Sequence, residues 1–165
     1  MEISELRNFL GQDLQRVEAL IARSLGSDIA LLDATNGMIL AHGGKRLRPM
    51  LALLTGGACG TVNEDTVRFA AASELLHNAT LLHDDVVDFW LVRAMDNILS
   101  ATRSGERVIR IFAKTLSDLA EGELLQMQKA SSADTTQEDY LRIIYSKTGS
   151  LFEASALSAA ISVGA

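Results

Sequence analysis

Residues 70–87 read AAASELLHNATLLHDDVV, and this stretch decides the fold. Its apolar residues would cover nearly every side of a helix, which indicates a helix that is buried on most faces. An acidic side chain inside such a helix is costly unless it is paired or binds a metal ion. The stretch therefore predicts a central helix that also carries a charged site.

Further helices are expected on both sides of this stretch. Leucine, valine and isoleucine recur every three or four residues over residues 2–24, which is typical of an amphipathic helix. The other expected helices run from a Ser27 cap to about residue 41, from Pro49 to about 60, from an Asn63 cap to 88 and onward to 101, over 106–129, and from a Thr135/Glu138 capping box through most of the remainder. No alternation typical of strands occurs. The sequence therefore predicts one all-α domain over residues 1–165.

The composition narrows the class of protein. Net charge is −6 with both signs interspersed, which argues against non-specific nucleic-acid binding. The single cysteine excludes an intramolecular disulfide and indicates a reducing compartment. The first residues lack the pattern of a signal peptide, and no apolar run reaches the roughly 20 residues that span a bilayer. A cytoplasmic protein without a membrane segment is expected.

The acidic residues at the end of the central stretch suggest a metal site. On one helix, Asp84 and Asp88 would project from the same face, about 6 Å apart along the axis. Mg²⁺ prefers one or two carboxylates together with waters and phosphate oxygens. His77 would lie two turns before Asp84 on nearly the same face, where it could donate to a phosphate. The alternative is an ordinary solvated acidic face, but the apolar surroundings favour the metal site.

A basic loop precedes this helix. Residues 43–49 read GGKRLRP, in which Lys45 and Arg48 are three residues apart and can converge on one anion. Arginine grips phosphate with two hydrogen bonds, and lysine adds a mobile charge. Alone, the loop would be read as a solvated turn at a helix start. Together with an acidic metal-binding helix, it points to a ligand rich in phosphate.

At these motifs the chain resembles the trans-polyprenyl diphosphate synthases. The matching stretches are GGKRLRPML (43–51), ASELLHNATLLHDDVVD (72–88), AEGELLQ (120–126) and YLRIIYSKTGSLFEAS (140–155). The resemblance implies an isoprenoid synthase-type helical bundle around a central cavity. The bundle would be incomplete, because the chain covers only about the N-terminal half of a usual family member.

The resemblance also implies a function and its residues. Lys45, Arg48 and His77 would hold the diphosphate of isopentenyl diphosphate. Asp84 and Asp88 would bind Mg²⁺ that bridges the diphosphate of an allylic prenyl diphosphate, which Lys147 and Thr148 would also contact. The expected reaction is a condensation of these two substrates, in which diphosphate leaves and the isopentenyl double bond attacks the allylic carbocation. A homodimer is expected.

Ala79 bears on the length of the product. It lies five residues before Asp84, at a position where shorter-chain family members often carry an aromatic residue. By this resemblance, alanine would leave the tunnel for the growing chain open, so a medium-to-long product is expected. The plain alternative is that alanine is a good helix former and common in cores.

The family pattern breaks after Asp88. Usual members continue with a polar stretch that holds an adjacent arginine pair, whereas this chain runs directly into FWLVRAMDNIL, with about 25 residues lost. Phe89 and Trp90 are therefore read as core residues of a downstream helix, and no motif role is given to Arg93. The second Asp-rich motif of the family is absent as well.

Three explanations of these losses are open. The sequence omits residues of a longer protein, the chain is a truncated piece, or it is a degenerate, non-catalytic relative. The first is favoured because a direct join of two long helices without a turn residue is hard to fold. It predicts a discontinuity of the backbone between Val87 and Trp90.

Two functions from other classes compete with the synthase. A non-catalytic partner subunit could dimerise with an active synthase, for example through the helix over 106–129. A di-metal carboxylate protein would need Glu-x-x-His elements. The three histidines, His42, His77 and His83, do not supply them.

Overall fold

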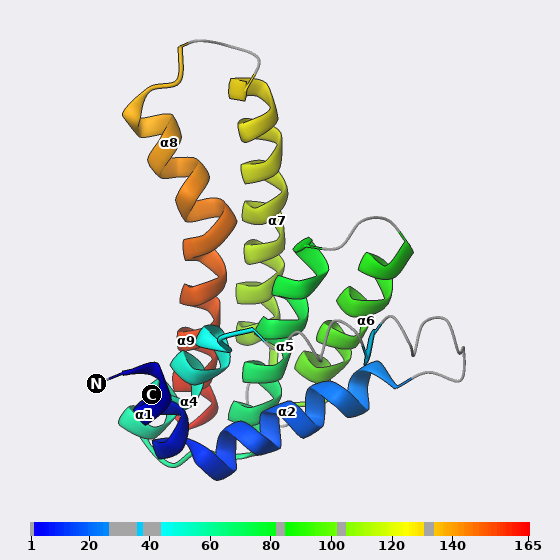
Figure 1. Cartoon of the computed structure of the whole chain (residues 1–165), viewed down its shortest axis with the longest axis vertical. Helices are drawn as coiled ribbons and strands as arrows, with labels where there is room; N and C mark the ends of the chain where they lie inside the picture. Colours follow the sequence, from blue (N-terminus) through cyan, green and yellow to red (C-terminus); the bar gives the residue numbers. More distant parts are fainter. Residues whose placement is uncertain (1, 27–35, 38–43, 82–84, 102–104, 131–133) are drawn as a thin grey trace.

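The computed structural model describes residues 2–26, 36–37, 44–81, 85–101, 105–130 and 134–165; for residues 81 and 85–88 only the backbone is described. Within these ranges every regular element is a helix, so the all-α prediction is confirmed (Figure 1). The elements are α1 (Ile3–Phe9), α2 (Gly11–Leu25), α4 (Leu47–Cys59), α5 (Glu64–Leu81), α6 (Asp85–Leu99), α7 (Gly105–Ala130), α8 (Gln137–Ile144), the π-helix η1 (Tyr145–Gly149) and α9 (Ser150–Ser162). Among the described helices, none is both long and apolar enough to cross a membrane.

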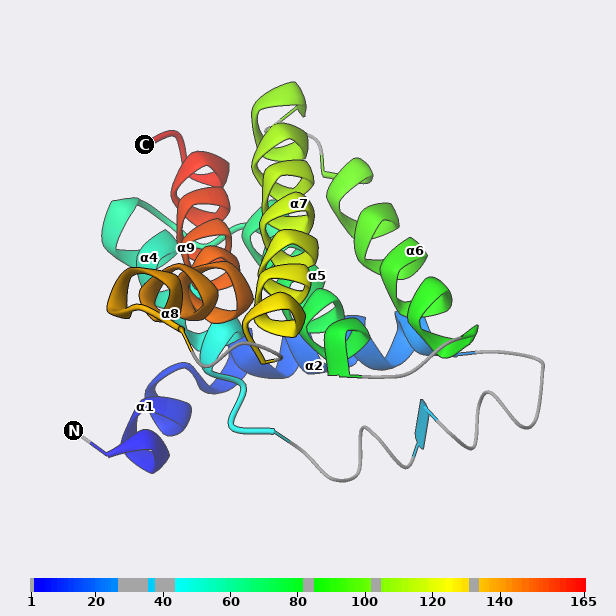
Figure 2. The same cartoon turned by 90° about the horizontal axis from the view of Figure 1, so that it is seen from above.

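Helix α5 is the centre of the bundle. Every residue from Phe69 to Leu76 is at most 4% exposed, as its all-round apolar pattern predicts. Helices α2, α4, α6 and α9 all pack against it (Figures 1 and 2). The polar side chains in this buried part of α5, Ser73 and Glu74, therefore lie where water cannot reach them, and they need partners on the surrounding segments.

The N-terminal region contains two helices where one was expected. The predicted helix over 2–24 is divided at Leu10 into α1 and α2. Its apolar stripe is nevertheless buried as predicted, since Leu14, Val17 and Ile21 are at most 5% exposed. The helix expected from Ser27 to about residue 41 lies outside the described residues.

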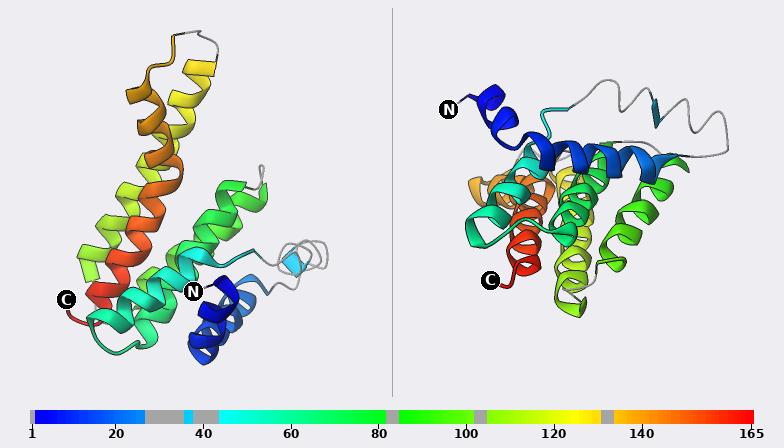
Figure 3. Two further views of the ribbon diagram at one scale, coloured as in Figure 1. Left: turned by 60° about the vertical axis from the view of Figure 1, so that its left-hand side comes forward. Right: turned by 90° about the horizontal axis from the view of Figure 1, so that it is seen from below.

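The C-terminal region forms a long antiparallel pair. Helix α7 lies beside the continuous helical run of α8, η1 and α9, and this pair projects beyond the rest of the bundle (Figure 3). Gly122 of α7 allows the close approach, because a Cβ there would lie 2.7 Å from the Cβ of Ser146. The helix predicted over 106–129 is confirmed.

The capping box of the last helical run is one residue later than predicted. The Thr136 hydroxyl accepts from the N–H of Asp139 at 3.1 Å, and the Asp139 carboxylate accepts from the N–H of Thr136 at 3.1 Å. The predicted pair of Thr135 and Glu138 fits the same sequence pattern. The observed frame lets the Asp139 carboxylate also bind the Lys129 ammonium at 2.9 Å, across to α7.

The single helix predicted from 64 to 88 is wrong. Helix α5 is described to Leu81 and α6 from Asp85, and the two helices lie side by side in opposite directions (Figure 1). The reason is burial. Trp90, Ala94 and Ile98 of α6 are at most 3% exposed, whereas a straight continuation of α5 would carry this face away from the core.

The predicted discontinuity between Val87 and Trp90 is also wrong. Helix α6 runs unbroken from Asp85 to Leu99, through Asp88 and Phe89. The reading of Trp90 as a core residue is confirmed, since it is fully buried. Its indole Nε1 donates to Asn36 Oδ1 at 3.0 Å, and Asn36 Nδ2 donates to the Leu25 carbonyl at 2.8 Å. The direct connection of Asp88 to Phe89 is therefore compatible with a folded helix. The expected difficulty of folding, which favoured omitted residues as the explanation, does not arise.

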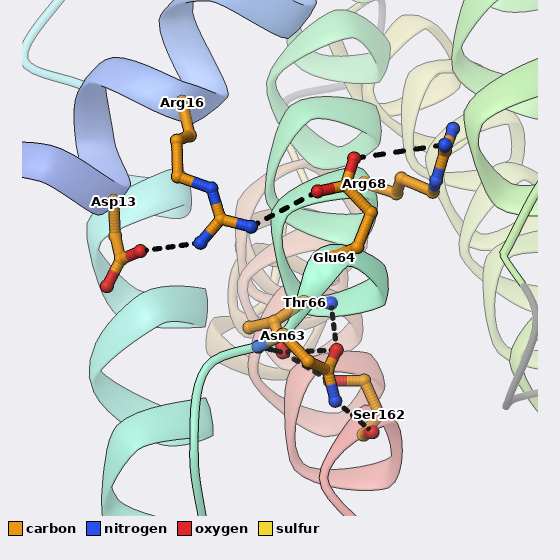
Figure 4. Close-up of polar contacts among 7 residues, drawn as sticks. All are labelled: Asp13, Arg16, Asn63, Glu64, Thr66, Arg68 and Ser162. Atoms are coloured by element: carbon orange, nitrogen blue, oxygen red, sulfur yellow. Dashed lines mark hydrogen bonds and ion pairs between the residues drawn. The ribbon is translucent and has the colours of Figure 1, made fainter.

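The predicted cap at Asn63 is confirmed (Figure 4). Asn63 Oδ1 accepts from the N–H of Thr66 at 3.0 Å, and Asn63 Nδ2 donates to the Ser162 carbonyl at 2.7 Å. The hydroxyls of Thr66 and Ser162 are 2.6 Å apart. On the exposed side, Glu64 binds Arg16 of α2 at 3.1 Å. These contacts tie the start of α5 to α9 and α2.

Adjacent glycines of α4 should respond oppositely to alanine. A Cβ at Gly56 would lie 2.7 Å from Thr66 Cγ2, and the hydrogen bonds of Thr66 prevent it from turning away. We expect Gly56→Ala to lower the free energy of unfolding by about 1–3 kcal/mol.

Gly57 provides the matched control. It is exposed, and its nearest neighbour would be 4.0 Å from a new Cβ. We expect Gly57→Ala to leave the free energy of unfolding unchanged or to raise it by up to about 1 kcal/mol. Urea unfolding followed by circular dichroism measures both changes. Equal effects at the two positions would contradict the packing described for α4 and α5.

Candidate functional site

The basic loop meets α4 in an unusual backbone conformation. Arg46, the N-cap of α4, has φ 55° and ψ 34°, in the left-handed region. It is the one non-glycine residue with positive φ within the described ranges. Such a conformation costs roughly 1–3 kcal/mol and persists only where the surroundings hold it. Pro49 lies in the first turn of α4, as predicted.

A buried ion pair holds this turn. Arg46 Nη1 is 2.9 Å from Glu74 Oε1, and the two side chains are only 9% and 5% exposed. Glu74 is on α5, so the pair joins the start of α4 to the central helix. Gly44 lies beside it, since a Cβ there would be 3.7 Å from the same carboxylate oxygen.

Arg48 is buried at the start of α4. Its guanidinium carbon is 4.4 Å from the ring centroid of Phe152 on α9, and its Nε has no hydrogen-bond partner in the described structure. Burial lowers the pKa of Arg48, and the charge of Glu74 opposes this shift. The Arg48 carbonyl accepts from Ser155 Oγ at 2.9 Å, which fixes α9 against α4. A buried cation with an unused donor is suited to an anionic ligand.

His77 lies one turn after Glu74 on α5 and is half-buried. Burial lowers the pKa of His77, the positive charge of Arg48 lowers it further, and the charge of Glu74 opposes both. Glu74 and His77 are three residues apart on α5, and Arg46, which binds Glu74, is two residues before Arg48. The structure thus brings together two of the predicted site residues, Arg48 and His77. Lys45 is exposed at the edge of the same loop.

The other two predicted substrate residues are in the π-helix η1. Lys147 Nζ is 2.9 Å from a carboxylate oxygen of Glu123 and donates to Gln126, both on α7. Thr148 is exposed. The two residues lie on the run that continues into α9 and Phe152, on which Arg48 packs. π-helical turns are frequent at functional sites.

The predicted metal ligands cannot be placed in the same way. Asp84 lies outside the described residues, and of Asp88 only the backbone is described, on α6. The two residues are not on one described helix. Within the part of the chain that is described, no group of three or more His, Cys, Asp or Glu residues could hold a metal ion. The expectation that Asp84 and Asp88 face one cavity with Lys45 and Arg48 remains a prediction.

Sequence reasoning missed the partners of these cations. Arg46 was grouped with the other basic residues of its loop, although it binds Glu74. The signal was present, because Glu74 is an acidic residue in an otherwise apolar helix and such a residue needs a buried partner. Glu123, Gln126 and Phe152 lie inside the quoted motifs but carried no predicted role.

His77 should make the stability of the folded protein depend on pH. Because its pKa is lowered on folding, the unfolded chain binds more protons at this side chain below about pH 6.5. We expect the free energy of unfolding to fall as the pH decreases through this range, and to fall less in His77→Gln. Urea unfolding above and below about pH 6.5 tests this. Equal losses of the free energy of unfolding in the two proteins would show that His77 contributes nothing to this pH dependence.

The chain matches the family model described as Polyprenyl synthetase over residues 29–94 and 89–165. It is 36% identical over 187 residues to the octaprenyl diphosphate synthase of Escherichia coli (strain K12), covering 99% of this chain and 58% of that relative. The polyprenyl synthase of Caulobacter crescentus CB15, complexed with calcium and isoprenyl diphosphate, has a TM-score of 0.92 and 32% identity, covering 99% of this chain and 61% of that one. The decaprenyl diphosphate synthase of Rhodobacter capsulatus has a TM-score of 0.89 and 34% identity, covering 99% and 59%.

These matches also show a difference in length. The chain spans about three fifths of these relatives. The alignment with the E. coli relative extends over 187 residues although this chain has only 165, and the two family matches meet at residues 89–94. The relative therefore carries residues that have no counterpart in this chain. The all-α isoprenoid synthase-type fold is confirmed, and the chain belongs to the polyprenyl synthetase family.

Proposed function

We propose that this chain takes part in condensing isopentenyl diphosphate with an allylic prenyl diphosphate, as a prenyltransferase. The observation that carries the proposal is Arg48, a buried cation with an unused Nε at the start of a helix. The positive end of the helix dipole adds to the attraction for an anion there. We assign the diphosphate of isopentenyl diphosphate to Lys45, Arg48 and His77.

We assign the allylic diphosphate to Lys147 and Thr148 of the π-helix η1. Lys147 is paired with Glu123, so an incoming diphosphate would have to exchange with this carboxylate. Asp84 and Asp88 would hold Mg²⁺, and a pair of carboxylates with phosphate oxygens suits this ion. When bound, Mg²⁺ would supply electrostatic stabilisation of the departing diphosphate. The cations of the chain would neutralise the remaining charge.

The product is proposed to be medium to long. Ala79 on α5 is 4% exposed. Because this residue is alanine, no aromatic ring at this position of the helix would block a growing prenyl chain. The names of two similar proteins, octaprenyl and decaprenyl diphosphate synthase, agree with this range.

One alternative is a non-catalytic partner subunit or a degenerate relative of such a synthase. By the sequence pattern, this chain lacks the arginine pair that the family usually carries after its acidic motif, and the E. coli relative has residues without a counterpart here. Without those arginines the two diphosphates would lose part of their binding charge. A protein of this kind would still bind isopentenyl diphosphate but would not catalyse the condensation.

We also propose a homodimer. Val92 and Leu99 of α6 are each 62% exposed, and with the half-buried Met95 they form an apolar stripe at spacings of three and four. Covering this stripe with a second copy would remove apolar surface from water.

Arg48→Met should weaken the binding of isopentenyl diphosphate about tenfold to hundredfold. A hydrogen bond to a charged group contributes about 1.5–3 kcal/mol, and Arg48 supplies such a group. Isothermal titration calorimetry measures the change. Arg107→Met is the control, because Arg107 is exposed at the start of α7, and it should bind as the unmodified chain does.

A second measurement separates synthase from partner subunit. The chain is incubated with radiolabelled isopentenyl diphosphate, an allylic prenyl diphosphate and Mg²⁺, and the products are separated by chromatography. Elongated prenyl diphosphates support the synthase, whereas binding without product supports the partner subunit. A chain that does not bind isopentenyl diphosphate at all would overturn both.

The homodimer can be tested by sedimentation velocity. We expect Val92→Asp/Leu99→Asp to convert dimers to monomers, because charges at the centre of an apolar interface are left without partners. Phe9→Asp is the control, since Phe9 is 78% exposed on α1, away from α6. A monomer at all concentrations before substitution, or a dimer after it, would refute this interface.

A further inference from the structure

The Arg46–Glu74 ion pair is placed beside the proposed diphosphate site without belonging to it. Both side chains are more than nine-tenths buried, and Arg46 Nη1 is already 2.9 Å from Glu74 Oε1. Arg46 is one residue from Lys45 and two from Arg48. Glu74 is one helical turn from His77. The pair therefore joins the two halves of the site, one on the loop and the other on α5.

Stability alone does not account for this pair. A buried ion pair loses the hydration of both charges, and apolar residues of similar size often serve as well or better. What a buried pair does provide is a fixed geometry, and here the geometry is demanding because Arg46 is in the left-handed region. The Arg46 carbonyl accepts from the N–H of Met50 at 3.0 Å, so the first hydrogen bond of α4 depends on this turn.

The direction of Arg48 follows from the same turn. Arg48 is the second residue of α4, and its guanidinium lies over the ring of Phe152 on α9. Its carbonyl is held by Ser155, whose hydroxyl is also 3.3 Å from that of Ser73, next to Glu74 on α5. A change in the Arg46 turn would rotate the start of α4 relative to α5 and move Arg48 away from His77.

We propose that Glu74 is a positioning residue of the isopentenyl diphosphate site and acts through Arg46, which is not itself a ligand of the diphosphate. The inference rests on the proposed function, because it concerns the same site. Glu74 neutralises Arg46, so that Lys45, Arg48 and His77 remain to meet the ligand. It also holds the turn from which Lys45 and Arg48 project.

A double-mutant cycle tests this assignment. The affinity for isopentenyl diphosphate is measured by calorimetry for the unmodified chain, Arg46→Met, Glu74→Leu and the double variant. Either single substitution leaves one buried charge without its partner, so we expect each to weaken binding about tenfold or more. In the double variant no charge is unpaired, but the ion pair that fixes the turn is also gone, so we expect the affinity to stay about as low as in either single variant.

The other possible roles give different results. If Arg46 is a ligand, Glu74→Leu frees its charge for the diphosphate and binds as tightly as the unmodified chain or more tightly, and the proposal is overturned. If the pair serves only stability, both single variants show a lower melting temperature with unchanged affinity, which also overturns it. If Glu74→Leu does not fold, Glu74→Gln takes its place, because the amide oxygen can still accept from Arg46; we then expect a smaller loss of affinity.

The control and the reference separate this inference from the proposed function. Glu64→Leu removes an exposed carboxylate from the same helix and should leave the affinity unchanged. Should the unmodified chain fail to bind isopentenyl diphosphate, the proposed function falls and this inference falls with it. Should it bind, and Glu74→Leu bind equally well, only the positioning role of Glu74 is refuted.

Discussion

Burial of the middle of α5, from Phe69 to Leu76, on every side is the constraint on which the rest of the structure depends. A helix surrounded in this way can keep polar side chains only where a neighbour supplies a partner. Thr66 meets Ser162 of α9, Ser73 meets Ser155 of α9, and Glu74 meets Arg46 before α4. Each of these three polar residues of α5 is thus a fixed point for one neighbouring segment. Because Glu74 needs a buried partner, the same requirement also joins the basic loop to the central helix through Arg46.

The cations of the site differ in how they are held. Arg48 lies against an aromatic ring with a donor unused, whereas Lys147 is bound to Glu123 and Gln126 on the exposed pair of helices. The first needs little rearrangement to receive an anion, because its position is set by packing. The second must exchange one partner for another. Two diphosphates that bind at such a site would therefore face different free-energy barriers to binding, although each binds to a positively charged side chain.

Sequence reasoning reached what depends on local pattern. The apolar spacing of α2, the cap at Asn63 and the long α7 follow from contacts within one or two turns, and each is confirmed. It failed where a distant contact decides. The reversal between α5 and α6 depends on burying Trp90, and the frame of the last capping box depends on Lys129 of α7. For the proposed site, Arg48 and His77 were predicted from the sequence and remain a prediction, but the pairing of Arg46 with Glu74 joins residues 28 positions apart and follows only from the packed fold.

Trp90 has a consequence for how this protein can be observed. It is the single tryptophan of the chain, fully buried, and its indole N–H is bound to Asn36, which in turn holds the end of α2. Its fluorescence therefore reports on the packing of α6 against α2. Detachment of α6 would expose the indole to water and shift its emission to longer wavelengths while the helices of α7 and α9 keep their circular dichroism. Emission and ellipticity that change together would instead indicate that the bundle opens as a single cooperative unit.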